Sequence, residues 1–267
     1  VIPVHFAGLP CDLPAIREAA GGATIIEDAA HALGARYRSG ERVGSCAHAD
    51  MAVFSLHPVK SIASGEGGVI TTNRSDLYRR LLRLRSHGIN KEDDPYLHPQ
   101  NAFQDGVRNR WYYEMQELGF NFRLTDLQAA LGLSQLGKLE RFLERRAALA
   151  ARYRALLPAA APRELRAAQS GGWGESANHL FVVRAAFDGF PGGRTAFMQK
   201  LFDRGYVTQV HYIPIPMQPF YARLGHDMAK LPECAKYYRE ALSIPLFYGL
   251  SDADQDRFLA DALECLR

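Results

Sequence analysis

Hydrophobic and polar positions over the first part of the chain change repeatedly between the period of a helix and that of a strand. Helical patterns cover 12–20, which ends at Gly21 and Gly22, and 75–85. Short apolar runs typical of buried strands alternate with them, at 2–6, 23–28, 51–56 and 67–72. Strands separated by helices are typical of a mostly parallel sheet flanked by helices, so the pattern predicts an α/β fold.

The stretch 86–123 follows neither period. It contains prolines, glycines and many polar residues, together with the aromatic residues Tyr96, Phe103, Trp111, Tyr112 and Tyr113. Ordered loops of this length are uncommon and are usually functional, and the aromatic side chains argue against disorder. We therefore expect a long loop that serves substrate binding or a subunit interface.

A strong helix signal covers 124–157. Thr125 and Gln128 form a capping box, and leucines then recur at a roughly helical period. We expect one long helix that links two domains, with Gly132 and Gly137 marking close packing or a bend.

The character of the sequence changes after this helix. An Ala-, Pro- and Gly-rich stretch leads to predicted strands at 179–184 and 206–214, separated by a helix at 195–204. Two further helices end the chain, the last opened by Ser251. The pattern predicts a small α+β domain over 158–267, and residues 1–157 then form part of a large domain.

The composition narrows the class of protein. The 267 residues are 47% hydrophobic and 23% charged, as in soluble globular proteins, and the net charge of +3 gives no electrostatic case for nucleic acid or membrane. The arginine-dense stretch 79–85 alternates with leucines and is typical of a solvated helix face. No apolar run approaches the roughly 18 residues of a membrane span, and no signal-peptide pattern opens the chain. Widely spaced cysteines (Cys11, Cys46, Cys234, Cys265) favour reduced thiols in the cytoplasm and no metal site.

Chemically capable residues follow two of the predicted strands. Asp28 and His31 come at the end of one strand, and Ser55 and Lys60 come at the end of the next, before the Gly-rich turn 65–68. Ligands bind at the carboxyl ends of the strands in open α/β sheets. Each residue also has an ordinary structural explanation: a helix cap, a core histidine, a buried hydroxyl and a surface lysine, in that order.

Together these residue types meet the requirements of a pyridoxal enzyme. Such an enzyme needs a lysine that forms a Schiff base and later moves a proton. A carboxylate against the pyridine nitrogen keeps the ring protonated, and a hydroxyl can hold the cofactor phosphate.

Four blocks of the chain carry a more specific resemblance. The segments 27–73, 82–89, 111–140 and 211–221 are similar to those of the DegT/DnrJ/EryC sugar aminotransferases. The motifs HPVK, RSHGI and WYYEMQELGFN most resemble the pseudaminic-acid branch of that family. The resemblance implies a type I aminotransferase-like fold and pyridoxal phosphate as cofactor. It also implies a substrate, because enzymes of this branch aminate the C4 keto group of a UDP-linked 4-keto-6-deoxy-N-acetylhexosamine, with L-glutamate as donor.

The resemblance assigns roles to particular residues. Lys60 matches the Schiff-base lysine, Asp28 the partner of the pyridine nitrogen and Ser55 the phosphate-binding serine. His31 stands where the family places Gln or His near the ring hydroxyl.

Three further residues match more distant parts of the family's site. Asn121, in GFNFR, matches an asparagine that reaches the phosphate in the neighbouring subunit, which implies a homodimer with shared sites. His211 and Tyr212 open the segment that matches the family's substrate segment.

One departure from the family accompanies these matches. The family has a preceding segment on the order of a hundred residues, with a phosphate loop that opens a helix and an aromatic residue that stacks on the ring. This chain begins at Val1 without that segment. Because a helix N-terminus is a major anion site, its absence would weaken cofactor binding. We expect either a fragment of a longer protein or a native truncation.

Other interpretations stay open. Sugar dehydratases of the same family carry His where Lys60 stands, so the lysine favours an aminotransferase. Relatives that make aminated cyclitols or aromatic amines are excluded less firmly. From a different class comes a truncated, non-catalytic subunit that only binds partners or sugars.

Overall fold

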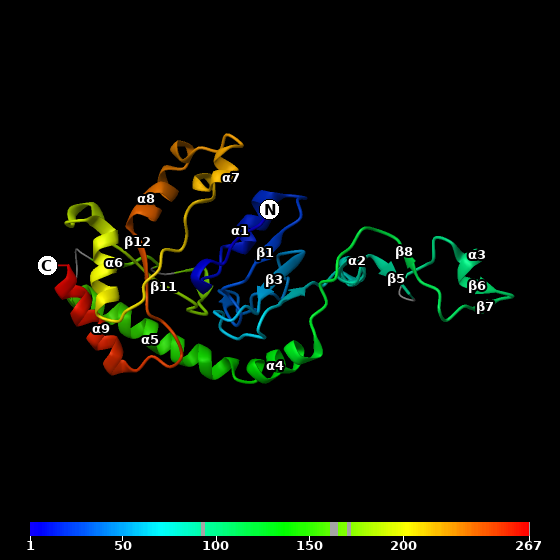
Figure 1. Ribbon diagram of the computed structural model, residues 1–267, viewed down its shortest axis with the longest axis horizontal. Coiled ribbons are helices and arrows are strands. Elements are labelled where there is room, and N and C mark those ends of the chain that lie inside the picture. Colours follow the sequence, from blue (N-terminus) through cyan, green and yellow to red (C-terminus); the bar gives the residue numbers. More distant parts are fainter. Residues whose placement is uncertain (92–93, 161–164, 170–171, 267) are drawn as a thin grey trace.

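A computed structural model describes residues 1–91, 94–160, 165–169 and 172–266. The molecule is elongated, with the N-terminal α/β region in the middle, the C-terminal region at one end and a narrow arm at the other (Figure 1). Among the described residues, no helix combines the length and the apolar character needed to cross a membrane.

The central sheet has the order β1-β3-β4, formed by Ile26–Asp28, Met51–Ser55 and Gly68–Thr71. β1 and β3 are parallel, with Asp28 opposite Val53, whereas β4 runs antiparallel to β3. The strand predicted at 2–6 is present only as a parallel bridge between Val4 and Asp28, although backbone hydrogen bonds join residues 1–5 to β1. The sheet therefore carries Asp28 at the end of a strand that has neighbours on both sides.

Short elements surround this sheet. The helix predicted at 12–20 is α1, Leu13–Ala20, and Asp12 caps it through the amide of Ala15 at 3.3 Å. The other elements here are η1, Phe6–Gly8, the two-residue strand β2, Arg36–Tyr37, and α2, Ser75–Arg85. Apolar side chains of α1, β2, β3 and the connecting segments form one core cluster: Leu13, Ile25, Ala29, Ala32, Ala35, Tyr37, Val43, Cys46, Ala52, Phe54 and Ala177.

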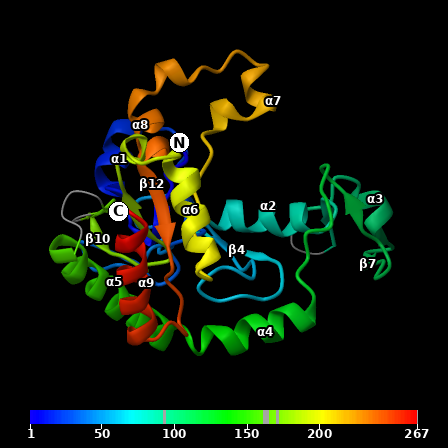
Figure 2. The same ribbon diagram turned by 60° about the vertical axis from the view of Figure 1, so that its left-hand side comes forward.

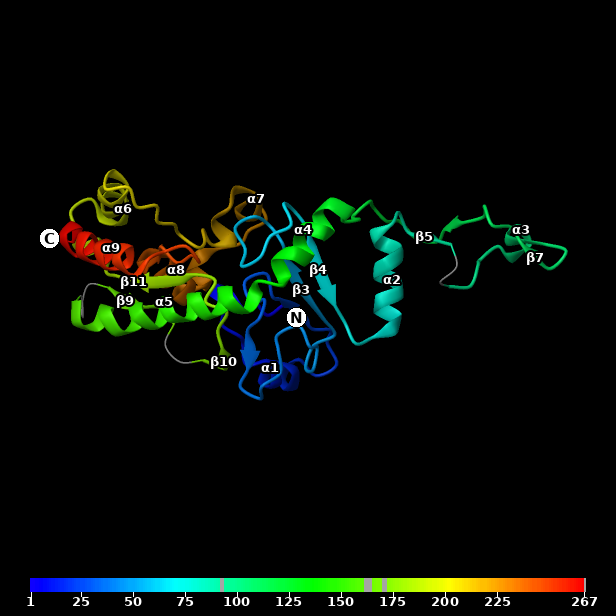
Figure 3. The same ribbon diagram turned by 90° about the horizontal axis from the view of Figure 1, so that it is seen from below.

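The stretch without a clear period, 86–123, forms the arm (Figures 1 and 3). It holds two small antiparallel pairs and one helical turn: β5 Ile89–Asn90 with β8 Glu114–Met115, β6 Phe103–Gln104 with β7 Val107–Arg108, and α3 Pro99–Ala102. At its base, a Cβ on Gly88 would lie 1.7 Å from the carbonyl oxygen of Glu117. The close approach of the two segments thus requires glycine at this position.

The long helix predicted at 124–157 is two helices, α4 Asp126–Leu136 and α5 Leu139–Ala160. The predicted capping box of Thr125 and Gln128 is confirmed. Gly137 caps α4 at the break between the two helices. Gly132 is buried, but a Cβ at this position would make only ordinary contacts, the nearest at 3.5 Å to the Ser64 side chain.

The C-terminal region contains an antiparallel sheet of order β12-β11-β9, formed by Ala241–Ile244, Phe181–Arg184 and Arg166–Ala167. Six helical elements lie between β11 and β12, and the first five are η2 Phe187–Gly189, α6 Gly193–Asp203, η3 Ile215–Met217, α7 Pro219–Ala222 and η4 Met228–Lys230. Then come α8, Pro232–Glu240, and, after β12, α9, Asp252–Cys265. The strand predicted at 206–214 was wrong, since this stretch makes only one bridge, from Gln209 to Ser243.

The C-terminal core includes one face of α5. Leu149, Tyr153 and Leu157 of α5 are buried with side chains of β11, α6, β12 and α9. Figure 2 shows α6, β12 and α9 close together in this region. The antiparallel pair β10, Gly174–Glu175, with β2 also joins the two regions.

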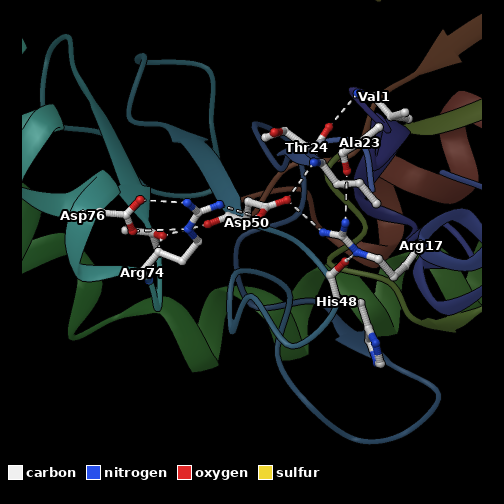
Figure 4. A network of polar contacts seen from close by, with 10 residues as sticks. Val1, Arg17, Ala23, Thr24, His48, Asp50, Arg74 and Asp76 are labelled. Carbon is white, nitrogen blue, oxygen red and sulfur yellow. Dashed lines mark hydrogen bonds and ion pairs between the residues drawn. The ribbon is translucent and has the colours of Figure 1, made fainter. Parts of the chain in front are cut away.

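A polar network at the start of β3 connects the elements around the sheet (Figure 4). The Asp50 carboxylate accepts hydrogen bonds from the Ile25 amide and from Arg17 Nη2, both at 2.9 Å, and from Arg74 Nη1 at 3.2 Å. The hydrogen bond from Ile25 is the largest cause that lowers the pKa of Asp50 to about 2. The carboxylate of Asp50, just before β3, thus connects three other parts of the fold. These are α1, the residue before β1 and the residue before α2.

Replacing Asp50 with Asn should lower the free energy of unfolding by about 1–3 kcal/mol, because charge-assisted hydrogen bonds to three groups are weakened. The folded-state pKa lies below the ordinary value of 3.8. The contribution is therefore complete above that value and is lost as the pH falls toward about 2. Urea unfolding at about pH 7 and about pH 3 measures this, and the gap between wild type and variant should shrink at the lower pH. Asp76→Asn, an exposed carboxylate on the same arginine, is the matched control and should change little.

Candidate active site

The parallel pairing of β1 and β3 places two predicted site residues at one edge of the sheet. Asp28 is the last residue of β1, and Ser55 is the last residue of β3. Residues 29–35 form turns rather than a helix, so the interpretation of Asp28 as a helix cap was wrong. Its Oδ1 accepts the Ala30 amide at 3.1 Å, which leaves further lone pairs of the carboxylate for another donor.

Lys60 lies in the turn that follows β3. Its amide donates to the carbonyl of His57 at 2.9 Å, and its side chain is half-buried. Burial lowers the pKa of the Lys60 ammonium, and the charge of Asp28 acts against this shift. A lysine with a lowered pKa exposes more of the free amine near neutral pH, and the free amine is the form that reacts with a carbonyl.

His31 connects this sheet edge to the C-terminal region. Its Nδ1 accepts the Ala7 amide at 3.3 Å, and its Nε2 lies 3.2 Å from the Tyr212 hydroxyl. Burial, followed by the charge of Lys60, lowers the pKa of His31 to about 4. His31 is therefore both a buried histidine bonded to backbone and a neighbour of the lysine.

The predicted substrate residues His211 and Tyr212 lie on the C-terminal side of the same group. His211 Nδ1 is 2.7 Å from the hydroxyl of Ser243 in β12. Burial and then the charge of Lys60 lower the pKa of His211, whereas burial and then Asp28 raise the pKa of the Tyr212 phenol. Both residues thus share an electrostatic environment with Lys60 and Asp28, although they are far from them in sequence.

Two predicted site residues are placed less closely. The Ser55 hydroxyl accepts the His57 amide at 3.3 Å and is half-buried at the strand end. Asn121 is exposed at the base of the arm, where it bridges to Ser86 and its Oδ1 accepts the Arg123 amide at 3.3 Å. The structure therefore groups Asp28, His31, Lys60, His211 and Tyr212, and leaves Asn121 exposed at the base of the arm.

Sequence reasoning missed the residues that line the other side of His31. The ring of His179, which precedes β11, lies 4.5 Å from the His31 ring. The ring of Phe6 lies 6.1 Å from His31 and 6.4 Å from Tyr212. A polar residue at the head of the buried run 179–184 was the one available signal, because such a position is usually apolar unless it has a partner.

The donor set fits a cofactor with an aldehyde, an aromatic nitrogen and a phosphate. A half-buried lysine supplies the amine, a strand-end carboxylate supplies a partner for a cationic ring nitrogen, and the Ser55 hydroxyl supplies a donor. These are the features of a site that binds pyridoxal phosphate.

Comparison with known proteins identifies the class. The chain belongs to the DegT/DnrJ/EryC1/StrS aminotransferase family, whose model matches residues 1–263. The spore coat polysaccharide biosynthesis protein SpsC of Bacillus subtilis is 33% identical over 274 residues, which cover 100% of this chain and 65% of SpsC. The chain spans about two thirds of the length of the curated relatives that it matches.

Solved structures confirm the type I fold that the resemblance implied. PseC of Helicobacter pylori, an aminotransferase involved in the biosynthesis of pseudoaminic acid, superposes with a TM-score of 0.86 at 26% identity, over 99% of this chain and 66% of PseC. The putative sugar aminotransferase Spr1654 of Streptococcus pneumoniae, in its PMP-form, gives 0.82 at 27% identity, over 99% of this chain and 68% of that one. Aminotransferases of this family depend on pyridoxal phosphate, and Spr1654 is also known in a PLP-form.

The electrostatic coupling of Asp28 to Lys60 gives a prediction. Replacing Asp28 with Asn should lower the pKa of Lys60 further, because the wild-type carboxylate stabilises the Lys60 ammonium and the amide would not. The rate at which an amine reagent modifies Lys60 in the cofactor-free protein, followed by peptide mass spectrometry against pH, measures the shift. Asp12→Asn, which removes a carboxylate from the cap of α1, is the control. An identical titration of Lys60 in both variants would show that Asp28 does not act on it.

Proposed function

We propose that the complete native protein is a cytoplasmic, pyridoxal-phosphate-dependent aminotransferase of nucleotide sugars. It transfers an amino group from L-glutamate to the C4 keto group of a nucleotide-linked keto-deoxysugar, in a biosynthesis of the pseudaminic-acid type. The observation that carries the proposal is the placement of a half-buried Lys60 within the electrostatic influence of Asp28, in a chain from an aminotransferase family.

The substrate class is supported by the named relatives. PseC is described as acting in the biosynthesis of pseudoaminic acid, and SpsC in that of the spore coat polysaccharide. Both descriptions concern amino or polymeric sugars. The motifs HPVK and RSHGI, which begin at His57 and Arg85, add the resemblance to the pseudaminic-acid branch.

The residues of this chain have separable roles in the proposed reaction. When bound, pyridoxal phosphate supplies the electron sink that lets a carbon beside the amine lose a proton. Lys60 anchors the cofactor and then takes and returns that proton, a task favoured by the lowered pKa of its amine. The Asp28 carboxylate holds a proton on the ring nitrogen, and the Ser55 hydroxyl donates to the phosphate.

The C-terminal residues bind and orient the sugar. His211 and Tyr212 come from a segment outside the central sheet, and contacts to Ser243 and His31 hold them over its edge. A site that closes between two regions excludes water from the reacting carbon, which favours amine transfer over hydrolysis. His31, uncharged at neutral pH, offers a hydrogen bond without a competing positive charge.

The test of this function is a substrate screen with the complete native protein. UDP- and dTDP-linked 4-keto-deoxysugars are supplied with L-glutamate, and both the aminated sugar and 2-oxoglutarate are measured. We expect amination of at least one keto-sugar, its loss in Lys60→Ala, and its retention in Lys236→Ala, which removes an exposed lysine. Dehydration of the sugar without consumption of glutamate would instead identify a dehydratase.

The arm supports a second part of the proposal, a homodimer with shared sites. Several of its large apolar side chains are more than half exposed in the single chain, among them Trp111, Tyr113, Met115, Leu118, Phe120 and Phe122. Exposed apolar patches of this kind mark interaction surfaces, and aromatic residues are enriched in them. Asn121 lies within this surface, so a two-fold dimer would present it to the partner.

Subunit mixing tests the shared site. Lys60→Ala and Asn121→Ala chains, each inactive alone, should recover about a quarter of the wild-type activity after exchange, because half of the dimers are mixed and each holds one intact site. Lys60→Ala mixed with Asp28→Ala is the matched control. It should recover nothing, since both residues serve the same subunit's site. No recovery in the first mixture, with subunit exchange shown by mass spectrometry, would place Asn121 in its own subunit's site.

A further inference from the structure

A buried histidine outside the predicted site lies between the central sheet and the C-terminal region. His179 is 5% exposed, and its ring packs against that of His31 in a tilted arrangement, with 4.5 Å between the ring centroids and an angle of 40° between the ring planes. Its amide donates to the Ala7 carbonyl at 3.0 Å. Its Nδ1 is buried and has no hydrogen-bond partner among the described residues. A buried polar ring without a partner is costly, which points to a role for it other than core packing.

The hydrogen bonds of His31 fix where its proton lies. The Ala7 amide can only donate, so Nδ1 of His31 must be the unprotonated nitrogen. In the neutral ring the proton is then on Nε2, which faces the Tyr212 hydroxyl at 3.2 Å. A second proton on Nδ1 would break the bond from Ala7, so the backbone itself opposes a charged His31.

We propose that His179 is a positioning residue, whose ring packs against His31 and keeps it where the Ala7 amide donates to Nδ1, so that His31 stays the Nε2–H tautomer directed at Tyr212. His179 and Ala7 both contact His31. The His179 ring packs against the His31 ring, and Ala7, whose carbonyl accepts the His179 amide, donates its own amide to Nδ1 of His31. The proposal deepens the proposed function, because it explains how a donor near Lys60 stays uncharged.

The charges around this pair favour the same state. His31 is faced by Lys60 and His211, which disfavour its protonation, and by Asp28, which favours it, and the Tyr212 phenol meets its Nε2. Behind His179 lies the buried guanidinium of Arg146, which binds the carbonyl of His179 at 3.1 Å and that of Leu246 at 3.0 Å. Burial, followed by the charges of His31 and of this guanidinium, holds the pKa of His179 far below its ordinary value, so the His179 ring is itself uncharged.

Histidine NMR on the complete native protein tests the proposal without using activity. With labelled histidine, the ring nitrogen shifts report the tautomer and the titration of His31, whose signals are assigned by their loss in His31→Gln. The wild type should show Nε2–H on His31 and remain neutral well below the ordinary pKa of 6.5. In His179→Ala, water reaches the exposed face, and the midpoint should rise by at least about one pH unit. His179→Phe keeps an aromatic ring against His31 and should preserve the wild-type titration of His31.

Each outcome decides the question. A proton on Nδ1 of His31 in the wild type would overturn the proposal, and this measurement needs no variant to fold. An unchanged midpoint in folded His179→Ala would show that His179 only fills space. Substrate turnover gives a separate readout, since the acid limb of the pH profile should move upward in His179→Ala but not in His226→Ala, an exposed control. If no substrate is found, the NMR result still stands, so failure of the proposed function can be distinguished from failure of the proposed role of His179.

Discussion

The parallel pairing of β1 with β3 is the constraint on which the site depends. Because parallel strands end at the same edge, the pairing of Asp28 with Val53 brings the carboxylate to the edge where β3 delivers Ser55 and, one turn later, Lys60. The Asp50 network holds the opposite end of the same pair in register. A slip of one residue would turn Asp28 to the other face of the sheet and remove the partner of Lys60.

The second half of the site comes from the joint between the two regions. Tyr212 contacts His31 although the two are far apart in the sequence, and His179, just before β11, packs against the same ring. Arg146 of α5 binds three carbonyl groups around this joint, those of Asn178, His179 and Leu246. The geometry of the site at the sheet edge therefore depends on the placement of the C-terminal region.

The sequence predicted those parts that depend on local pattern and failed where distant segments decide. Periodicity and capping were enough to predict several elements. They include the strands that end at Asp28 and Ser55, the helix cap at Thr125 and the strand within 179–184. The strand predicted at 206–214 was wrong because only Gln209 of this stretch pairs with β12. The strand β12, a short apolar run between two helices, was not predicted. His179 was missed because its partner, His31, is distant in the chain.

The central claim is that Lys60 carries the cofactor at this edge. The most direct measurement is borohydride reduction of the complete native protein with its cofactor bound, followed by peptide mapping of the pyridoxyl label. Lys60 is the half-buried amine beside Asp28, so the label should be found on the peptide that contains it, and the visible absorbance of the cofactor should disappear on reduction. A label on any other lysine, or none in a protein that demonstrably holds the cofactor, would contradict the account.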